Sequence, residues 1–206
     1  MKSALGILAI AIGAGAAIIA ITSLLLGLRR GDDRLLAAGR RGITVVVIAS
    51  IAAVAVMEWA LVTHDFSIRY VAENNARSTP LLFTITGLWA ALEGSILLWV
   101  LILAGYIAVT VRHFRDRASE PLVVWATVVM LGVALFFLLL VLGPANPFHL
   151  TPGGAPIDGR GPNPLLQNHP LMAFHPPMLY LRDVGFTVPF GFAMASLITR
   201  SEEHTS

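Results

Sequence analysis

The sequence contains no cysteine and few charged residues. Without cysteine, the chain cannot form structural disulfides, thiolate metal sites or a thiol relay of its own. Charged residues make up 13% of the 206 positions, whereas soluble domains carry about 25%. Apolar residues make up 56%, and the mean hydropathy is +0.78. This is the composition of a membrane protein, with no room for a large separate soluble domain.

Motifs of common soluble enzymes are also missing. The sequence has no phosphate-binding loop, zinc-protease helix or nucleophile elbow. The glycine-rich stretch 151–161 has neither the lysine nor the strand-helix context of a phosphate cradle. These absences disfavour hydrolytic and kinase chemistry. We expect the chain to be embedded in a lipid bilayer and not to bind nucleic acid.

Long apolar segments recur along the whole chain. A bilayer-spanning helix needs roughly 20 apolar residues, and we expect five such helices, at 4–28, 42–63, 86–111, 121–143 and 178–199. Residues 81–88 are expected to form a turn or short helix at the outer surface. The sequence therefore predicts an all-α, polytopic transmembrane helix bundle in which residues 1–199 are one domain.

Arginine distribution predicts the orientation of the bundle. Eight arginines lie in two connections, 29–41 and 112–120. Short basic connections face the cytoplasm, so the connections 64–80 and 144–177 and the N-terminus are expected on the periplasmic side of a bacterial inner membrane. The protein is expected to be multi-pass.

The outer segment 144–177 carries nine prolines and Gly153-Gly154, so it cannot be one helix. Apolar residues such as Phe148 and Leu171 are interleaved with the prolines. We expect a Pro/Gly-rich periplasmic lid that lies on the membrane. Residues 200–206 break abruptly from the apolar helix before them and are expected to be a non-native tail, with the natural protein continuing past Thr199.

His175 is the histidine with the most informative neighbours, in Phe174-His175-Pro176-Pro177-Met178-Leu179-Tyr180. Proline disfavours helix in the residue before it and suits a first helical turn, so His175 is expected to be extended, just before the fifth helix. Haem iron takes an axial imidazole in a partly apolar surround, which Phe174, Met178 and Tyr180 could supply in part. The alternative is that the prolines only cap a helix and His175 contacts lipid headgroups.

A second candidate group lies near the outer end of the third helix. Glu93 is an acid at the edge of an apolar span and needs a partner or water. Trp89 and Glu93, like Ser95 and Trp99, are spaced to share one helix face, and Gly94 allows another helix to approach. Packing explains this pattern as well as chemistry does.

Six ordered blocks carry a family resemblance. They are Arg30-Gly31-Asp32, 65–72, 93–99, Asn146-Pro147-Phe148, 163–167 and 174–180. In this order, over residues 1–199, they resemble the CcmF/NrfE-type subunit of bacterial cytochrome c maturation. In two places the sequence departs from that family's pattern: Ala90 and Leu92 replace a glycine and a histidine, and Leu181-Arg182-Asp183 replaces Met-Gly-Tyr.

The resemblance implies a haem lyase subunit that attaches haem to c-type cytochromes. Such a protein receives haem b from the haem chaperone CcmE and works with CcmH/CcmI-type subunits on apocytochrome c. His175 occupies the position of one axial haem ligand, while the WWD segment and the second ligand would lie beyond Thr199. The chain alone is therefore expected to be inactive.

Two other functions remain open at this point. Three acids lie in the expected apolar helices, namely Glu58, Glu93 and Asp183. Acids in such positions are typical of a secondary transporter or ion-translocating membrane subunit. They are expected near the outer end, however, which favours a surface site over a pathway. The third possibility is a structural assembly subunit without a ligand.

Overall fold

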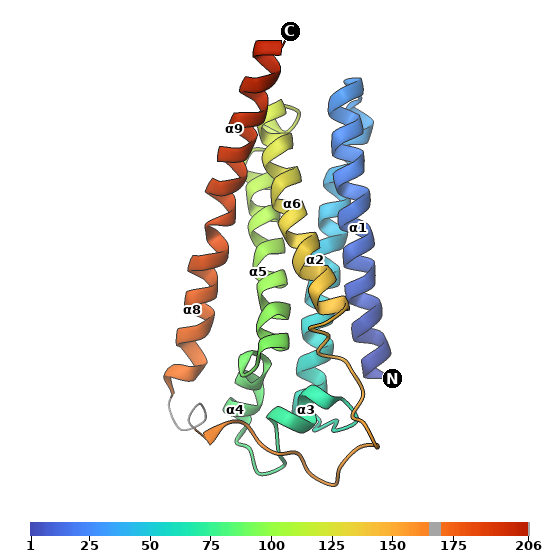
Figure 1. Cartoon of the computed structure of the whole chain (residues 1–206), viewed down its shortest axis with the longest axis vertical. Coiled ribbons are helices and arrows are strands. Elements are labelled where there is room, and N and C mark those ends of the chain that lie inside the picture. Colours follow the sequence, from blue (N-terminus) through green and yellow to red (C-terminus); the bar gives the residue numbers. More distant parts are fainter. Residues whose placement is uncertain (165–169, 206) are drawn as a thin grey trace.

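The structure, a computed structural model, describes residues 1–164 and 170–205. These residues form helices and no strand. Five helical spans are long and apolar enough to cross a membrane (Figure 1). They are α1 (Lys2–Arg30), α2 (Asp33–Val62), α5 (Leu92–His113), α6 (Pro121–Leu142), and Ala173–Arg200, which runs through α8 (Leu171–Gly185) and α9 (Thr187–Thr205). The expected all-α membrane bundle is confirmed.

Helices α1 and α2 form a tight antiparallel hairpin. Gly31 adopts a left-handed conformation with φ of 62°, which suits glycine because it has no Cβ. The Asp32 carboxylate then accepts hydrogen bonds from the backbone N–H groups of Arg34 and Leu35, at 2.8 and 3.4 Å, and so caps α2. The expected connection 29–41 is therefore wrong, because a turn of two residues suffices and the following arginines lie within α2.

Small residues let α1 and α2 approach closely. A Cβ on Gly39 would lie 2.6 Å from Cγ of Leu24, and one on Gly42 would lie 2.9 Å from Cβ of Ala20. Helices in lipid gain stability from such close backbone packing rather than from the hydrophobic effect.

The expected third helix is interrupted. The chain forms a short helix α4 (Leu81–Thr86) and a 3-10 turn η1 (Gly87–Trp89), and Ala91 is extended before α5 begins. The short helix expected at 81–88 is thus present, but the span begins at Leu92 rather than at residue 86. At its other end, α5 reaches the 3-10 turn η2 (Arg115–Arg117), which leads to α6.

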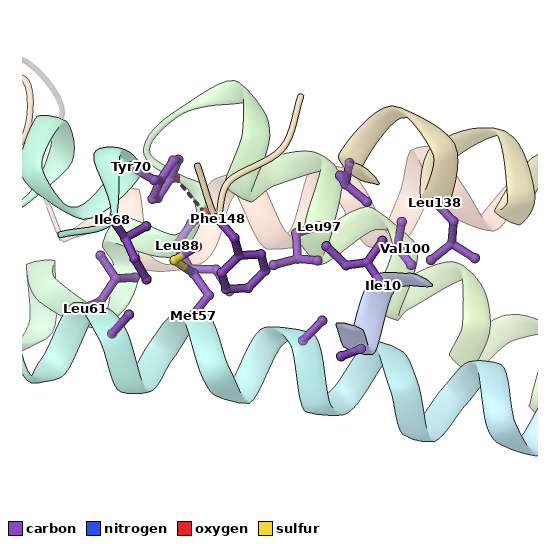
Figure 2. Packing of buried hydrophobic residues seen from close by; sticks show 14 of the residues in the cluster. Ile10, Met57, Leu61, Ile68, Tyr70, Leu88, Leu97, Val100, Leu138 and Phe148 are labelled. Atoms are coloured by element: carbon purple, nitrogen blue, oxygen red, sulfur yellow. Dashed lines mark hydrogen bonds between the residues drawn. The ribbon is translucent and has the colours of Figure 1, made fainter. Parts of the chain in front are cut away.

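One cluster of buried residues joins the helices to the loops at one end of the bundle. Figure 2 shows the ring of Phe148 among Met57, Leu88 and Leu97. Phe148 is fully buried, and its backbone N–H donates to Oδ1 of Asn146 at 2.9 Å. The Asn146-Pro147-Phe148 block therefore anchors the proline-rich segment in the bundle.

Two loop segments, 63–80 and 144–163, pack on each other to form what we call the cap layer. The first contains the short helix α3 (Arg69–Asn74). The backbone N–H of Arg69 donates to the carbonyl of His149 at 2.8 Å, and that of Arg160 donates to the carbonyl of Ala72 at 2.8 Å. The proline- and glycine-rich segment 144–163 is thus held by the segment 63–80.

The last span consists of two helices in line, α8 and α9 (Figure 1). α8 packs on α5 and α9 packs mainly on α6. A Cβ on Gly191 would lie 2.9 Å from Cγ of Met130, so α9 also approaches through a small residue. The helix continues to Thr205, and the non-native origin expected for residues 200–206 stays a prediction.

Candidate functional site on helix α8

His175 lies inside a helix and not before one. α8 begins at Leu171, after Pro170, and continues through Pro176 and Pro177. The expectation that His175 is extended just before the fifth helix is therefore wrong. The physical reason is that Pro170 provides the helix start, and the preference of a residue before proline for extended backbone is a bias that packing can override. The side chain of His175 is exposed.

One face of α8 docks on α5 through Tyr180. The Tyr180 hydroxyl and Ser95 Oγ are 3.0 Å apart in a hydrogen bond, and the Tyr180 ring meets the Trp99 ring edge-on at 5.6 Å between centroids. Further along, the Tyr106 hydroxyl donates to the carbonyl of Leu181 at 2.9 Å. Three of the predicted site residues, Ser95, Trp99 and Tyr180, are thus brought together as a docking contact.

The opposite face of α8 is exposed and apolar around the imidazole. Met178 shares this face with Phe174 and His175, because it follows them by four and three residues. Phe174 is 67% exposed and Met178 is 65% exposed. No hydrogen bond or ion pair joins the imidazole to another residue of 1–164 or 170–205. Within the described part of the chain, the helix therefore presents an imidazole without a polar partner on an apolar strip.

This strip fits one side of a haem. Haem iron takes an axial imidazole, and the haem ring packs on apolar side chains. His175 offers the imidazole, and Phe174 and Met178 offer the apolar side chains. Among the described residues no group of three or more His, Asp and Glu side chains is placed to hold a metal ion. His149 and His64 lie in the cap layer, and His169 lies outside the described residues. The residues present fit half of a haem site.

Glu93 and Trp89 are separated by the break before α5. Because Ala91 is extended and Trp89 belongs to η1, the expected shared helix face of Trp89 and Glu93 is wrong. The carbonyl of Trp89 instead accepts a hydrogen bond from Ser95 Oγ at 3.2 Å. Glu93 lines a small pocket with Arg69, Glu73 and His149 among others. Ser95 and Trp99 keep their expected spacing within α5.

The acids that favoured a transporter do not form a path through the bundle. Glu58 lies in the last turns of α2 and Glu93 in the first turn of α5, and these two helix ends meet the cap layer. Asp183 is exposed and pairs with the neighbouring Arg182 at 3.0 Å, so the ion pair expected there is present. Glu58 and Glu93 therefore lie at the cap-layer end of the bundle. Asp183 instead lies near the middle of the last span, beside the contact of Leu181 with Tyr106, so the expectation that it lies near the outer end is wrong.

Tyr70 was not singled out from the sequence, but it organises the break before α5. Its buried hydroxyl lies 2.9 Å from the carbonyls of Gly87 and Leu88 and accepts from the N–H of Ala91 at 3.3 Å. Burial raises the pKa of this phenol. A Cβ on Gly94 would overlap the Tyr70 hydroxyl, so the glycine makes room for it. The sequence signal that could have identified Tyr70 is its position in the block 65–72, one of the six blocks that carry the family resemblance.

Known proteins resemble the chain over nearly its whole length. The family described as "Cytochrome C assembly protein" matches residues 89–206. The cytochrome c-type biogenesis protein CcmF of Escherichia coli is 40% identical over 84% of this chain and 26% of its own length. The cytochrome c-type biogenesis protein CycK of Rhizobium meliloti is 42% identical over 94% of this chain and 28% of its own length.

A solved structure agrees with the sequence relatives. Cytochrome c Heme Lyase CcmF superposes with a TM-score of 0.80 at 33% identity, covering 97% of this chain and 31% of that chain. This chain therefore spans less than a third of the length of these relatives. The fold, the family match and the spaced sequence blocks agree, and the chain belongs to the cytochrome c assembly protein family, with CcmF-type proteins among its relatives.

Proposed function

We propose that this chain is the part of a cytochrome c haem lyase that receives haem b on the exposed face of α8. The observation that carries the proposal is the exposed imidazole of His175 between Phe174 and Met178, which are both mostly exposed. An apolar strip with one imidazole is the surface that one face of a haem requires. Haem bound there would supply the vinyl groups that apocytochrome cysteines add to.

Each residue of α8 has a distinct part in this proposal. His175 supplies an axial nitrogen, and Phe174 and Met178 form an apolar wall. Pro176 and Pro177 restrict the backbone next to His175, because their rings fix φ. Tyr180 holds the helix on α5 through Ser95 and Trp99. Positioning an imidazole in this way reduces the conformational entropy lost when a ligand binds.

The proposed orientation places the cap layer and the N-terminus in the periplasm, across a bacterial inner membrane. Lys2 pairs with Asp65 at 3.3 Å, so the N-terminus lies beside the cap layer, and His175 follows that layer in the chain. The arginines at the adjoining ends of α1 and α2 and those of the α5–α6 connection lie at the opposite end of the bundle. Short basic connections face the cytoplasm. Haem would then arrive from the chaperone CcmE and pass, with CcmH/CcmI-type partners, to apocytochrome c.

A chimera tests the proposal. The matching segment of Escherichia coli CcmF would be replaced by this chain and expressed in cells without their own CcmF, and covalently bound haem in exported cytochromes would be measured. We expect His175→Ala to abolish maturation while membrane insertion continues, because the change adds no charge to the span.

The matched control is His149→Ala, since His149 is also an exposed histidine at the same end of the bundle. Its variant, like His64→Ala, is expected to retain most activity. Normal maturation by His175→Ala would contradict the proposal. If His169→Ala instead abolished maturation, the ligand would be His169.

A further inference from the structure

A pocket lies between α2 and α5 at the end opposite the cap layer, outside the face that carries His175. Its volume is about 360 Å³. Arg40 lines it from α2, and Arg112 and Arg115 line it from α5 and η2. None of its described lining residues is acidic. Three arginines thus line one cavity, and no carboxylate residue is among its described lining residues.

Arg40 also carries a buried hydrogen-bond donor. Its Nη1 atom is buried and has no partner among the residues that the structure describes. A buried charged donor without an acceptor costs free energy, so such groups are normally paired. Arg115 pairs only with the exposed Asp116, at 3.6 Å. The arginines that line the pocket give it a positive charge, which favours an anionic ligand.

The rest of the lining is apolar and follows the two membrane helices. Ile43 and Val47 continue the Arg40 side of α2, while Ala108 and Val111 continue the Arg112 side of α5. These residues recur at three- and four-residue spacing, so each helix contributes one stripe. Thus a charged mouth at the helix ends leads into an apolar groove along the spans.

We propose that this pocket binds an anionic phospholipid, with the phosphate on Arg40, Arg112 and Arg115 and an acyl chain along the groove. Arginine suits the phosphate because its planar guanidinium donates two parallel hydrogen bonds. The apolar groove favours a lipid over a free phosphate, because only a lipid fills both parts. Basic pockets between membrane helices on the cytoplasmic side are a known kind of site for anionic headgroups.

The test measures the binding of spin-labelled phosphatidylglycerol to the 206-residue chain in phosphatidylcholine vesicles. Spin-labelled phosphatidylcholine is the reference lipid. We expect phosphatidylglycerol to be preferred and Arg40→Lys to weaken that preference about fivefold, because lysine keeps the charge but loses the forked donor. Arg112→Lys serves as a second variant, and circular dichroism verifies that each variant remains helical.

Arg30→Lys is the matched control, because Arg30 lies at the same end of the bundle and does not line the pocket. It is expected to leave the preference unchanged. An equal loss in Arg30→Lys and Arg40→Lys would show diffuse attraction and overturn the proposal. Equal binding of the two lipids would overturn it as well. Displacement of phosphatidylglycerol by millimolar inorganic phosphate would assign the pocket to free phosphate instead.

Discussion

The ring of Phe148 occupies the space where a side chain on Gly6 would lie. A Cβ added to Gly6 would overlap three carbons of that ring, and Ser3 Oγ donates to the carbonyl of Phe148 at 2.8 Å. The first turns of α1 thus hold the proline-rich half of the cap layer in the bundle. This contact joins residues that are more than 140 positions apart in the sequence.

Gly6→Ala is expected to destabilise the chain by about 1 to 3 kcal/mol, the usual cost of overfilling a packed core. Thermal unfolding in detergent, followed by circular dichroism, measures the effect. Gly15→Ala is the matched control in the same helix, since a Cβ there meets no atom within 4 Å. Equal unfolding temperatures for the two variants would contradict the packing described for Phe148.

Tyr70→Phe is expected to cost about 1 to 3 kcal/mol, because it removes the partner of buried carbonyls at the break before α5. The same unfolding experiment tests it. Tyr106→Phe removes a hydroxyl from a more exposed hydrogen bond to Leu181, so its cost is expected to be smaller. A larger loss in Tyr106→Phe than in Tyr70→Phe would contradict the role given to Tyr70.

Asp65 is expected to make the cap layer sensitive to acid. Partial burial opposes ionisation of this carboxyl, but hydrogen bonds from Ser67 and Lys2 and the Lys2 charge outweigh burial, and its pKa lies below the ordinary 3.8. A carboxyl whose pKa is lower in the folded state than in the unfolded state stabilises the fold at a pH above its unfolded-state pKa. This stabilisation is lost as the pH falls through the folded-state pKa. The unfolding temperature should therefore drop as the pH falls below 3.8.

Asp65→Asn removes the titrating group and should reduce this drop in unfolding temperature. Asp116→Asn is a suitable control, because Asp116 is mostly exposed and pairs only with its neighbour Arg115. If Asp65→Asn left the acid-dependent drop unchanged, the Lys2–Asp65 pair would not link the N-terminus to the cap layer as described.

Local signals in the sequence were enough to predict the membrane bundle. Each span is a long apolar segment, and hydropathy alone reveals it. The start of α2 at Asp33 could also have been read, because Gly31-Asp32 combines a typical helix end with a typical helix cap. The charge of the arginines that follow favours a loop in the sequence, but charge does not prevent helix formation.

The geometry of the candidate site was not predictable from the sequence, and the site residues themselves stay a prediction. The Phe-His-Pro-Pro block drew attention to His175 through family resemblance. Its helical backbone depends on Pro170 and on the contact of Tyr180 with Ser95, which lies 85 residues away. Such a contact has no local signal. The break at Ala91 depends similarly on Tyr70, a residue of another loop.

The most direct test of the central claim is the absorption spectrum of haem in the purified chimera carrying His175→Cys. This chain has no cysteine, so the substitution places a single thiol in this segment of the chimera, and a thiolate ligand changes the electronic state of haem iron. We predict an altered Soret spectrum in His175→Cys and an unchanged one in His149→Cys. Identical spectra in His175→Cys and the unsubstituted chimera, with equal haem content, would show that His175 is not an axial ligand.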